Sequence, residues 1–189
     1  MKAIVFLADG FEEIEALSPV DYLRRSGVEV TTVSVLGNSV VHGAHKVDVI
    51  ADCSLKQFID SGNIGEIDAV VVPGGMPGAS NIASNSEALD IIQKIFDGGK
   101  LVAAICASPA VVLGQTNVLN GKKWCCYPGM AHNAGNFTVS YDSSRRVIAD
   151  GNLITAIGPG AAEEFSVEIV NYLLGSEVKS KVFSAAQIR

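Results

Sequence analysis

The chain has 189 residues, of which 48% are hydrophobic and 18% are charged, and its formal net charge at pH 7 is -6. This length and composition suit one well-cored globular domain, residues 1–189, and leave little chain for a second one. The acidic balance, without any run of lysines and arginines, argues against nucleic acid or an acidic membrane surface as a partner.

The N-terminal apolar stretch at 3–8 is too short for the hydrophobic region of a signal peptide, and acidic residues follow it at once. No other apolar run approaches the roughly 18 residues that a membrane span needs. Without a secretory signal, the four cysteines are expected to be reduced thiols in a cytoplasmic protein. They are Cys53, Cys106, Cys125 and Cys126.

Short β-branched strands alternate with amphipathic helices along the chain, which is typical of βαβ units. Strands such as 68–72 are continuous apolar runs after their first residue, Asp68, as a parallel sheet covered on both faces requires. We therefore predict a doubly wound α/β sandwich. Its elements are a strand at 2–7, a helix at 13–26, strands at 28–35 and 69–73, a helix at 86–97, a strand at 101–105, a helix after Cys106 and a closing helix at about 161–174.

Some segments depart from this alternation. Residues 137–142 and 146–157 are predicted as strands, and Asp150-Gly151-Asn152 is a turn signal for a hairpin. Residues 37–48 are predicted to form another small hairpin. The tail at 177–188 is predicted to be a helix that packs back on the domain.

Cys106 stands where an apolar strand runs into Ala107-Ser108-Pro109, which predicts a strand, a sharp turn and a helix with the cysteine at the apex. Amides at a helix start favour an anion, so a thiol held there is expected to have a pKa below the value of about 8.5 for a free cysteine. The alternative is a core cysteine, because free cysteine is among the most buried residue types. The turn alone leaves both interpretations open.

Ligands bind an open parallel sheet at the carboxyl ends of its strands. Four loops are expected there on one rim: residues 9–15, residues 73–78, the Cys106 turn and residues 158–160. Gly74 and Gly75 remove Cβ atoms where the backbone must approach something closely, and their amides can join the amide of Ala107 in holding an oxyanion. A plain turn is the alternative.

Glu12, Glu13 and Glu15 begin the first helix. Carboxylates favour the positive end of a helix dipole and face water, and we expect this of two of the three. Either Glu12 or Glu15 can point inward toward the rim. A carboxyl desolvated beside a thiolate would have a raised pKa, stay protonated and donate a hydrogen bond.

The three histidines, His42, His45 and His132, are not adjacent to Cys106 in sequence and are expected at the surface or in loops. The cysteines and histidines show no metal-ligand spacing, and neither a phosphate-binding loop nor a serine elbow is present. The sequence therefore predicts neither a metal nor a nucleotide cofactor.

Four motifs, in this order, resemble the ThiJ/PfpI superfamily and, within it, the Parkinson-linked deglycase branch called DJ-one. They span nearly the whole chain: residues 8–15 (ADGFEEIE), 72–75 (VPGG), 104–109 (AICASP) and 158–160 (GPG). The resemblance implies a flavodoxin-like, mostly parallel sheet sandwiched by helices, like that of class I glutamine amidotransferases. It also implies a homodimer without a cofactor.

For the site, the resemblance implies that Cys106 is the reactive cysteine, that Glu15 is a protonated glutamate touching it, and that the amides of Gly75 and Ala107 form an oxyanion site. Members are described as cofactor-independent glyoxalases and deglycases, as sensors whose cysteine oxidises to a sulfinate, and as chaperones in oxidative stress.

Three positions depart from the family pattern. Ala107 replaces the histidine of the peptidase branch, which argues against proteolysis. Tyr127 replaces a histidine of the deglycase branch; it can hydrogen-bond a substrate oxygen, or be a buried aromatic whose hydroxyl is satisfied. His45 replaces an arginine that the family places beside the site from the partner subunit.

Two hypotheses follow. In the first, Cys106 attacks a small dicarbonyl such as methylglyoxal and Glu15 moves a proton, giving a 2-hydroxy acid without glutathione, metal or nicotinamide. In the second, Cys106 oxidises to a sulfinate stabilised by Glu15, and the protein is a redox-sensing, chaperone-like binder without physiological turnover.

Overall fold

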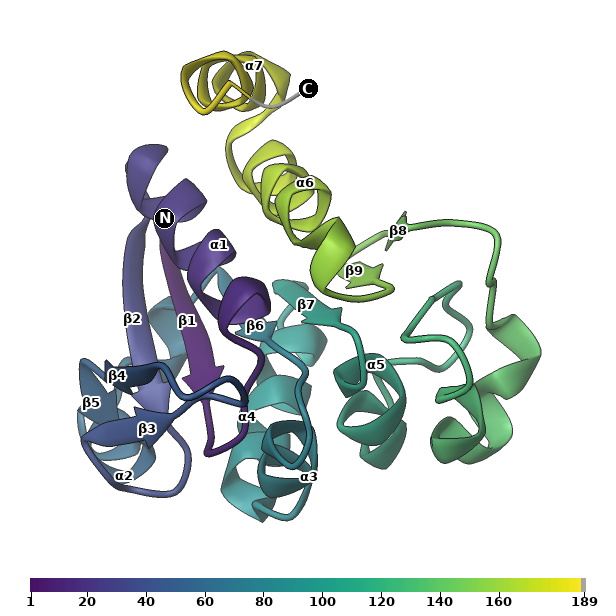
Figure 1. Cartoon of the computed structure of the whole chain (residues 1–189), viewed down its shortest axis with the longest axis horizontal. Coiled ribbons are helices and arrows are strands. Elements are labelled where there is room, and N and C mark those ends of the chain that lie inside the picture. The colour runs from purple at the N-terminus through teal and green to yellow at the C-terminus, as the bar shows by residue number, and fades with distance from the viewer. Residues whose placement is uncertain (188–189) are drawn as a thin grey trace.

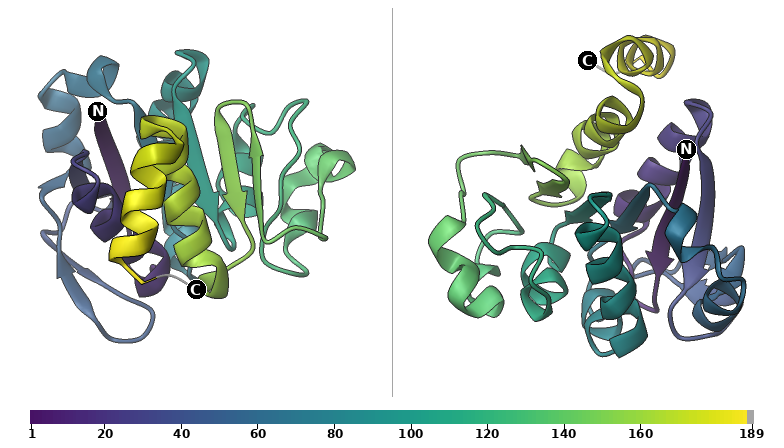
Figure 2. Two further views of the ribbon diagram at one scale, coloured as in Figure 1. Left: turned by 90° about the horizontal axis from the view of Figure 1, so that it is seen from above. Right: turned by 180° about the vertical axis from the view of Figure 1, so that it is seen from behind.

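The structure, a computed structural model, describes residues 1–187. Its centre is a seven-stranded sheet with strand order β5-β2-β1-β6-β7-β9-β8, and helices cover both faces of this sheet (Figures 1 and 2). The pairings are parallel except for β8 with β9. The predicted doubly wound sandwich is confirmed. The strands are β1 (Lys2–Leu7), β2 (Glu29–Ser34), β5 (Cys53–Ser54), β6 (Ala69–Val72), β7 (Leu101–Ile105), β8 (Val147–Asp150) and β9 (Leu153–Ala156).

A hydrophobic core lies on each face of the sheet, because successive side chains of a strand point to opposite faces. In β1, Ile4 and Phe6 face one core, and Val5 and Leu7 face the other. Helices α2, α3 and α4 cover the first core, and α1, α6 and α7 cover the second. The helices are α1 (Glu13–Arg25), α2 (Leu55–Asp60), α3 (Gly78–Ala83), α4 (Ser86–Asp97), α5 (Ser108–Val111), α6 (Ala162–Leu174) and α7 (Ser176–Ala185). Each helix of residues 1–187 is too short or too polar to cross a membrane.

The predicted strand at 137–142 is wrong. Most of this segment belongs to a stretch of 3-10 helix, Ala131–Ser140, whose backbone is not helical at Gly135. Trp124 explains the difference, because its indole donates to the Phe137 carbonyl (3.0 Å) and its carbonyl accepts from the Asp142 amide (2.9 Å). The chain therefore wraps around a buried tryptophan instead of extending. The hairpin turn at 150–152 is confirmed, since it joins β8 to β9.

The predicted small hairpin is also confirmed, with β3 (Val40–His42) antiparallel to β4 (Asp48–Ile50). Its loop lies against the start of α1, because the Ala44 amide donates to the Phe11 carbonyl (2.8 Å). Helix α7 packs on α6 and buries Val182 in the second core, as predicted for the tail. Residue 188 of that predicted helix lies outside the described residues.

Because β1, β6, β7 and β9 run parallel, their carboxyl ends meet at one edge of the sheet. The four predicted loops follow these strands. This edge is the predicted rim, and it positions the candidate site.

Candidate active site

Cys106 follows β7 directly and has a φ of +64°, a left-handed conformation that is uncommon for residues other than glycine. Two backbone hydrogen bonds hold this turn: the Cys106 amide donates to the Ala156 carbonyl (2.9 Å), and the Tyr127 amide donates to the Cys106 carbonyl (2.8 Å). The thiol is half-buried. Strained residues of this kind persist where the surrounding structure fixes them, often at active sites.

Ser108 is a residue of this turn that the sequence did not single out. Its hydroxyl is buried and donates to the Pro73 carbonyl at 2.6 Å. This bond ties the turn after β7 to the glycine loop after β6. Nothing in the sequence distinguishes Ser108 from the other small residues of the turn, because its partner is 35 positions away.

Glu15 is the acidic residue that points inward. It is fully buried on α1, and its Oε2 accepts a hydrogen bond from the Gly74 amide at 2.9 Å. The Cys106 thiol lies on the other side of Gly74 and acts on the pKa of this carboxyl. Within residues 1–187, Oε1 has no hydrogen-bond partner. Burial raises the pKa of Glu15 to about 7, against the lowering effect of the hydrogen bonds from Cys106 and Gly74.

The prediction of a lowered pKa for Cys106 is wrong. Burial, followed by the negative charge of Glu15, raises the pKa of the Cys106 thiol to about 12. Hydrogen bonds from the amides of Gly75 and Ala107 lower it, but by less. Helix α5 has four residues, so its dipole is too short to overcome burial. Near neutral pH the Cys106 thiol therefore keeps its proton, and Glu15 is the carboxyl beside it.

Gly74 lies against the side chains of both Cys106 and Glu15. A Cβ on Gly74 would lie 2.6 Å from the Cβ of Cys106 and 2.6 Å from Oε2 of Glu15. Only glycine allows both groups to approach this loop. The Gly74 amide already donates its hydrogen bond to Glu15. The glycine amide that acts on the Cys106 sulfur is therefore that of Gly75.

We expect Gly74→Ala to destabilise the protein by about 1–3 kcal/mol, because the added methyl overlaps both Cys106 and Glu15. Chemical denaturation measures this loss. Gly65→Ala is the matched control, since a Cβ on Gly65 meets nothing within 4 Å. Equal stabilities of the two variants would contradict the close packing of the pair.

Tyr127 and Gly158 lie beside the sulfur. Tyr127 is 48% exposed, so the interpretation of a buried aromatic is wrong. A Cβ on Gly158 would lie 3.2 Å from Cδ2 of Tyr127 and 4.0 Å from Sγ of Cys106. The loop after β9 and the tyrosine therefore flank the thiol.

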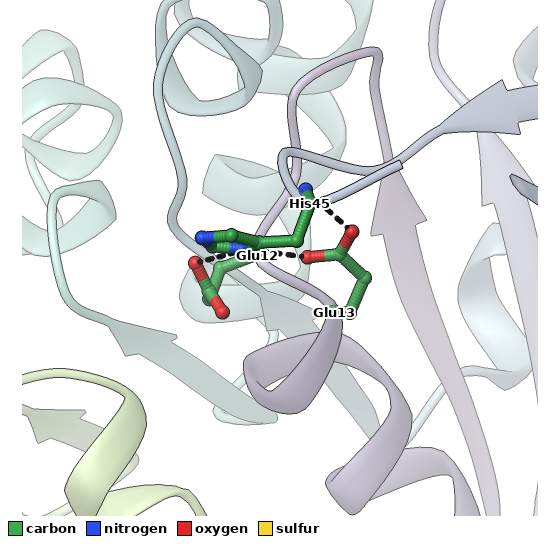
Figure 3. A group of neighbouring side chains, drawn as sticks. All are labelled: Glu12, Glu13 and His45. Atoms are coloured by element: carbon green, nitrogen blue, oxygen red, sulfur yellow. Dashed lines mark hydrogen bonds and ion pairs between the residues drawn. The ribbon is translucent and has the colours of Figure 1, made fainter. Parts of the chain in front are cut away.

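The expectation that two of the three glutamates face water is also wrong. The side chains of Glu12 and Glu13 are 14% and 10% exposed. His45, from the β3–β4 loop, contacts both through Nδ1, at 3.5 Å and 3.0 Å (Figure 3). All three histidines are exposed, as predicted.

The raised pKa of Glu15 has a consequence for stability. Between pH 4.5 and about 7 the folded state keeps a proton on Glu15 that the unfolded state has lost. Stability therefore falls as the pH rises through this window, by about 3 kcal/mol in total.

We expect Glu15→Gln, which cannot ionise, to escape this loss. Relative to the wild type, the variant gains stability between pH 5 and pH 8, and urea unfolding of both proteins at the two pH values measures the gain. A difference in stability that is the same at both pH values would show that Glu15 does not titrate as described.

Comparisons with known proteins agree with this architecture. The DJ-1/PfpI family model matches residues 1–172. The protein dj-1beta of Drosophila melanogaster is 38% identical over 181 residues, which cover 96% of this chain and 94% of that protein. A protein of Pyrococcus abyssi named as a deglycase is 31% identical over 173 residues, 92% of this chain and 99% of that protein.

Among solved structures, the crystal structure of Drosophila melanogaster DJ-1beta superposes with a TM-score of 0.91 at 36% identity. The match covers 100% of this chain and 98% of that chain. It confirms the flavodoxin-like fold implied by the four sequence motifs. The chain belongs to the DJ-1/PfpI family.

Proposed function

We propose that the protein is a cofactor-independent glyoxalase or deglycase that acts on small dicarbonyls such as methylglyoxal, or on their adducts, in protection against carbonyl and oxidative stress. The observation that carries this proposal is the buried Glu15 carboxyl beside the Cys106 thiol, with the amides of Gly75 and Ala107 at the sulfur. The deglycase name of the Pyrococcus abyssi relative supports it.

In the first step, Cys106 attacks the aldehyde carbon of methylglyoxal while the Glu15 carboxylate accepts the thiol proton. A bond forms between sulfur and carbon, and the carbonyl electron pair moves to oxygen. The amides of Gly75 and Ala107 hydrogen-bond the resulting oxyanion, and Tyr127 can donate to the neighbouring substrate oxygen.

In the second step, Glu15 first returns the thiol proton to the oxyanion and becomes a carboxylate again. It then takes the proton of the former aldehyde carbon and delivers it to the neighbouring ketone carbon, while the hydroxyl proton passes to the ketone oxygen. The first carbon is thereby oxidised to a thioester, and the second is reduced to an alcohol. Water then hydrolyses the thioester, releasing lactate and restoring the thiol. The oxidation and the reduction occur within one substrate, so no external redox partner takes part.

The test is to mix the purified protein with methylglyoxal in buffer free of glutathione and to follow lactate by proton NMR. We expect lactate to form in proportion to protein concentration. Lactate formation at the rate of buffer alone would overturn the proposal. If mild peroxide then adds two oxygens to Cys106, as seen by intact mass and peptide mapping, the redox-sensing alternative gains support.

We also propose that the chain acts as one domain, in the cytoplasm, as a homodimer. The four free cysteines support a reducing compartment. Apolar side chains on α1 and the β3–β4 hairpin are exposed, as is common at interfaces between subunits: Ile14 (53%), Val47 (48%) and Ile50 (77%). Light scattering after gel filtration tests the assembly, and the mass of a single chain would contradict it.

A further inference from the structure

A cluster of potential metal ligands lies at the start of α1, apart from the Cys106–Glu15 contact. Glu12, Glu13 and His45 each offer one ligand atom, and these atoms all lie within 4.8 Å of one another. Figure 3 shows the imidazole of His45 between the two carboxylates. Nδ1 of His45 is 3.0 Å from Oε2 of Glu13 and 3.5 Å from Oε2 of Glu12.

These distances are close to the spacing of ligands around zinc. In a tetrahedral zinc site, ligand atoms about 2.0–2.2 Å from the ion lie about 3.3–3.6 Å from one another. The distance from His45 to Glu12 lies within this range, and the distance to Glu13 is shorter by about 0.3 Å, as expected for a hydrogen bond without the ion. An imidazole nitrogen with carboxylate oxygens is also a ligand set that zinc accepts.

The charges of the cluster are not balanced. Glu12 and Glu13 are largely buried, yet within residues 1–187 neither carboxylate contacts a lysine or an arginine. Their one potential counter-ion is His45, whose own side chain is 70% exposed. Buried carboxylates are normally paired with cations or coordinate metals. Two neighbouring carboxylates carry more negative charge than a single imidazole can neutralise, and a divalent cation would balance this charge.

The ligands are also held in position. Oε1 of Glu13 accepts hydrogen bonds from the amides of His45 (2.7 Å) and Val47 (3.4 Å), which leaves Oε2 directed at the imidazole. The backbone amide of Glu12 donates to the Gly74 carbonyl at 3.1 Å. The other end of the same hairpin shows an ordinary surface pair, because the imidazole of His42 contacts the carboxylate of Asp48, whose side chain is 59% exposed.

We propose that Glu12, Glu13 and His45 bind a divalent transition-metal ion, Zn²⁺ in particular. Binding replaces the hydrogen bond between Nδ1 of His45 and Glu13 with a bond from Nδ1 to the metal, the displaced proton goes to solvent, and water fills the remaining position. Spacing among cysteines and histidines in the sequence does not reveal this site, because two of its ligands are carboxylates 32 and 33 positions before the histidine. The proposal goes beyond the proposed function, whose steps do not use this ion.

Isothermal titration calorimetry with Zn²⁺ tests the site in the wild type, His45→Gln and the matched control His42→Gln. We expect one ion per chain in the wild type and in His42→Gln, and an affinity lower by about tenfold or more in His45→Gln. Both histidines are exposed, so neither variant should unfold. Equal zinc affinities of the wild type and His45→Gln would overturn the proposal.

Titration with Co²⁺ identifies the ligands in the unchanged protein, because cysteine thiolates also bind zinc. We expect a visible d–d band without the near-ultraviolet charge-transfer band of a cobalt–thiolate bond. A charge-transfer band that disappears in Cys106→Ser or Cys53→Ser would place the metal at a thiol and overturn the proposal. Lactate formation measured in the presence of a chelator tests the proposed function separately.

Discussion

Replacing Cys106 with serine is expected to lower the rate of lactate formation from methylglyoxal by about a thousandfold or more. A hydroxyl is far less acidic than a thiol, so a carboxylate whose pKa is about 7 cannot activate it in the same way. Time courses by proton NMR without glutathione measure both rates. Fold stability should change little, because serine is close to cysteine in size.

Cys53→Ser is the matched control. Cys53 is also half-buried and free, but it lies in β5 at the edge of the sheet, four strands away from β7. We expect this variant to keep the wild-type rate. If Cys53→Ser loses lactate formation and Cys106→Ser keeps it, the nucleophile has been assigned to the wrong cysteine.

Glu15→Gln is expected to lower kcat by about 10²–10⁴-fold with a smaller effect on KM. The amide side chain can still accept the hydrogen bond from the Gly74 amide through its oxygen, but it cannot take a proton from Cys106. Steady-state kinetics of lactate formation measure the two constants separately. A variant whose KM rises while kcat is unchanged would show that Glu15 binds substrate without transferring protons.

Much of the fold follows from local patterns in the sequence. The apolar strands and the amphipathic helices predict the parallel sheet, and the Asp150-Gly151-Asn152 turn predicts the hairpin at its edge. The strand predicted at 137–142 does not form. Local sequence pattern does not reveal that Trp124 makes hydrogen bonds with the Phe137 carbonyl and the Asp142 amide of this segment.

The sequence predicts where the backbone of the site lies, but it does not predict the pKa values of the groups in it. The turn sequence around Cys106 and the paired glycines indicate where the sulfur and the amides of Gly75 and Ala107 lie. The sign of the thiol pKa shift depends on how deeply the turn is buried and on contact with Glu15, and both arise from packing of α1 against the rim. Likewise, only the folded hairpin brings His45 to the first helix.

The coupling of Glu15 to Cys106 is the central claim, and the pH dependence of Cys106 alkylation by iodoacetamide, followed by peptide mass spectrometry, tests it most directly. In the wild type, we expect the rate constant to rise through pH 7 and then level off, as the pair loses its first proton. In Glu15→Gln, this inflection should be absent. Rate constants that increase in parallel in the two proteins, without an inflection near pH 7, would contradict the account.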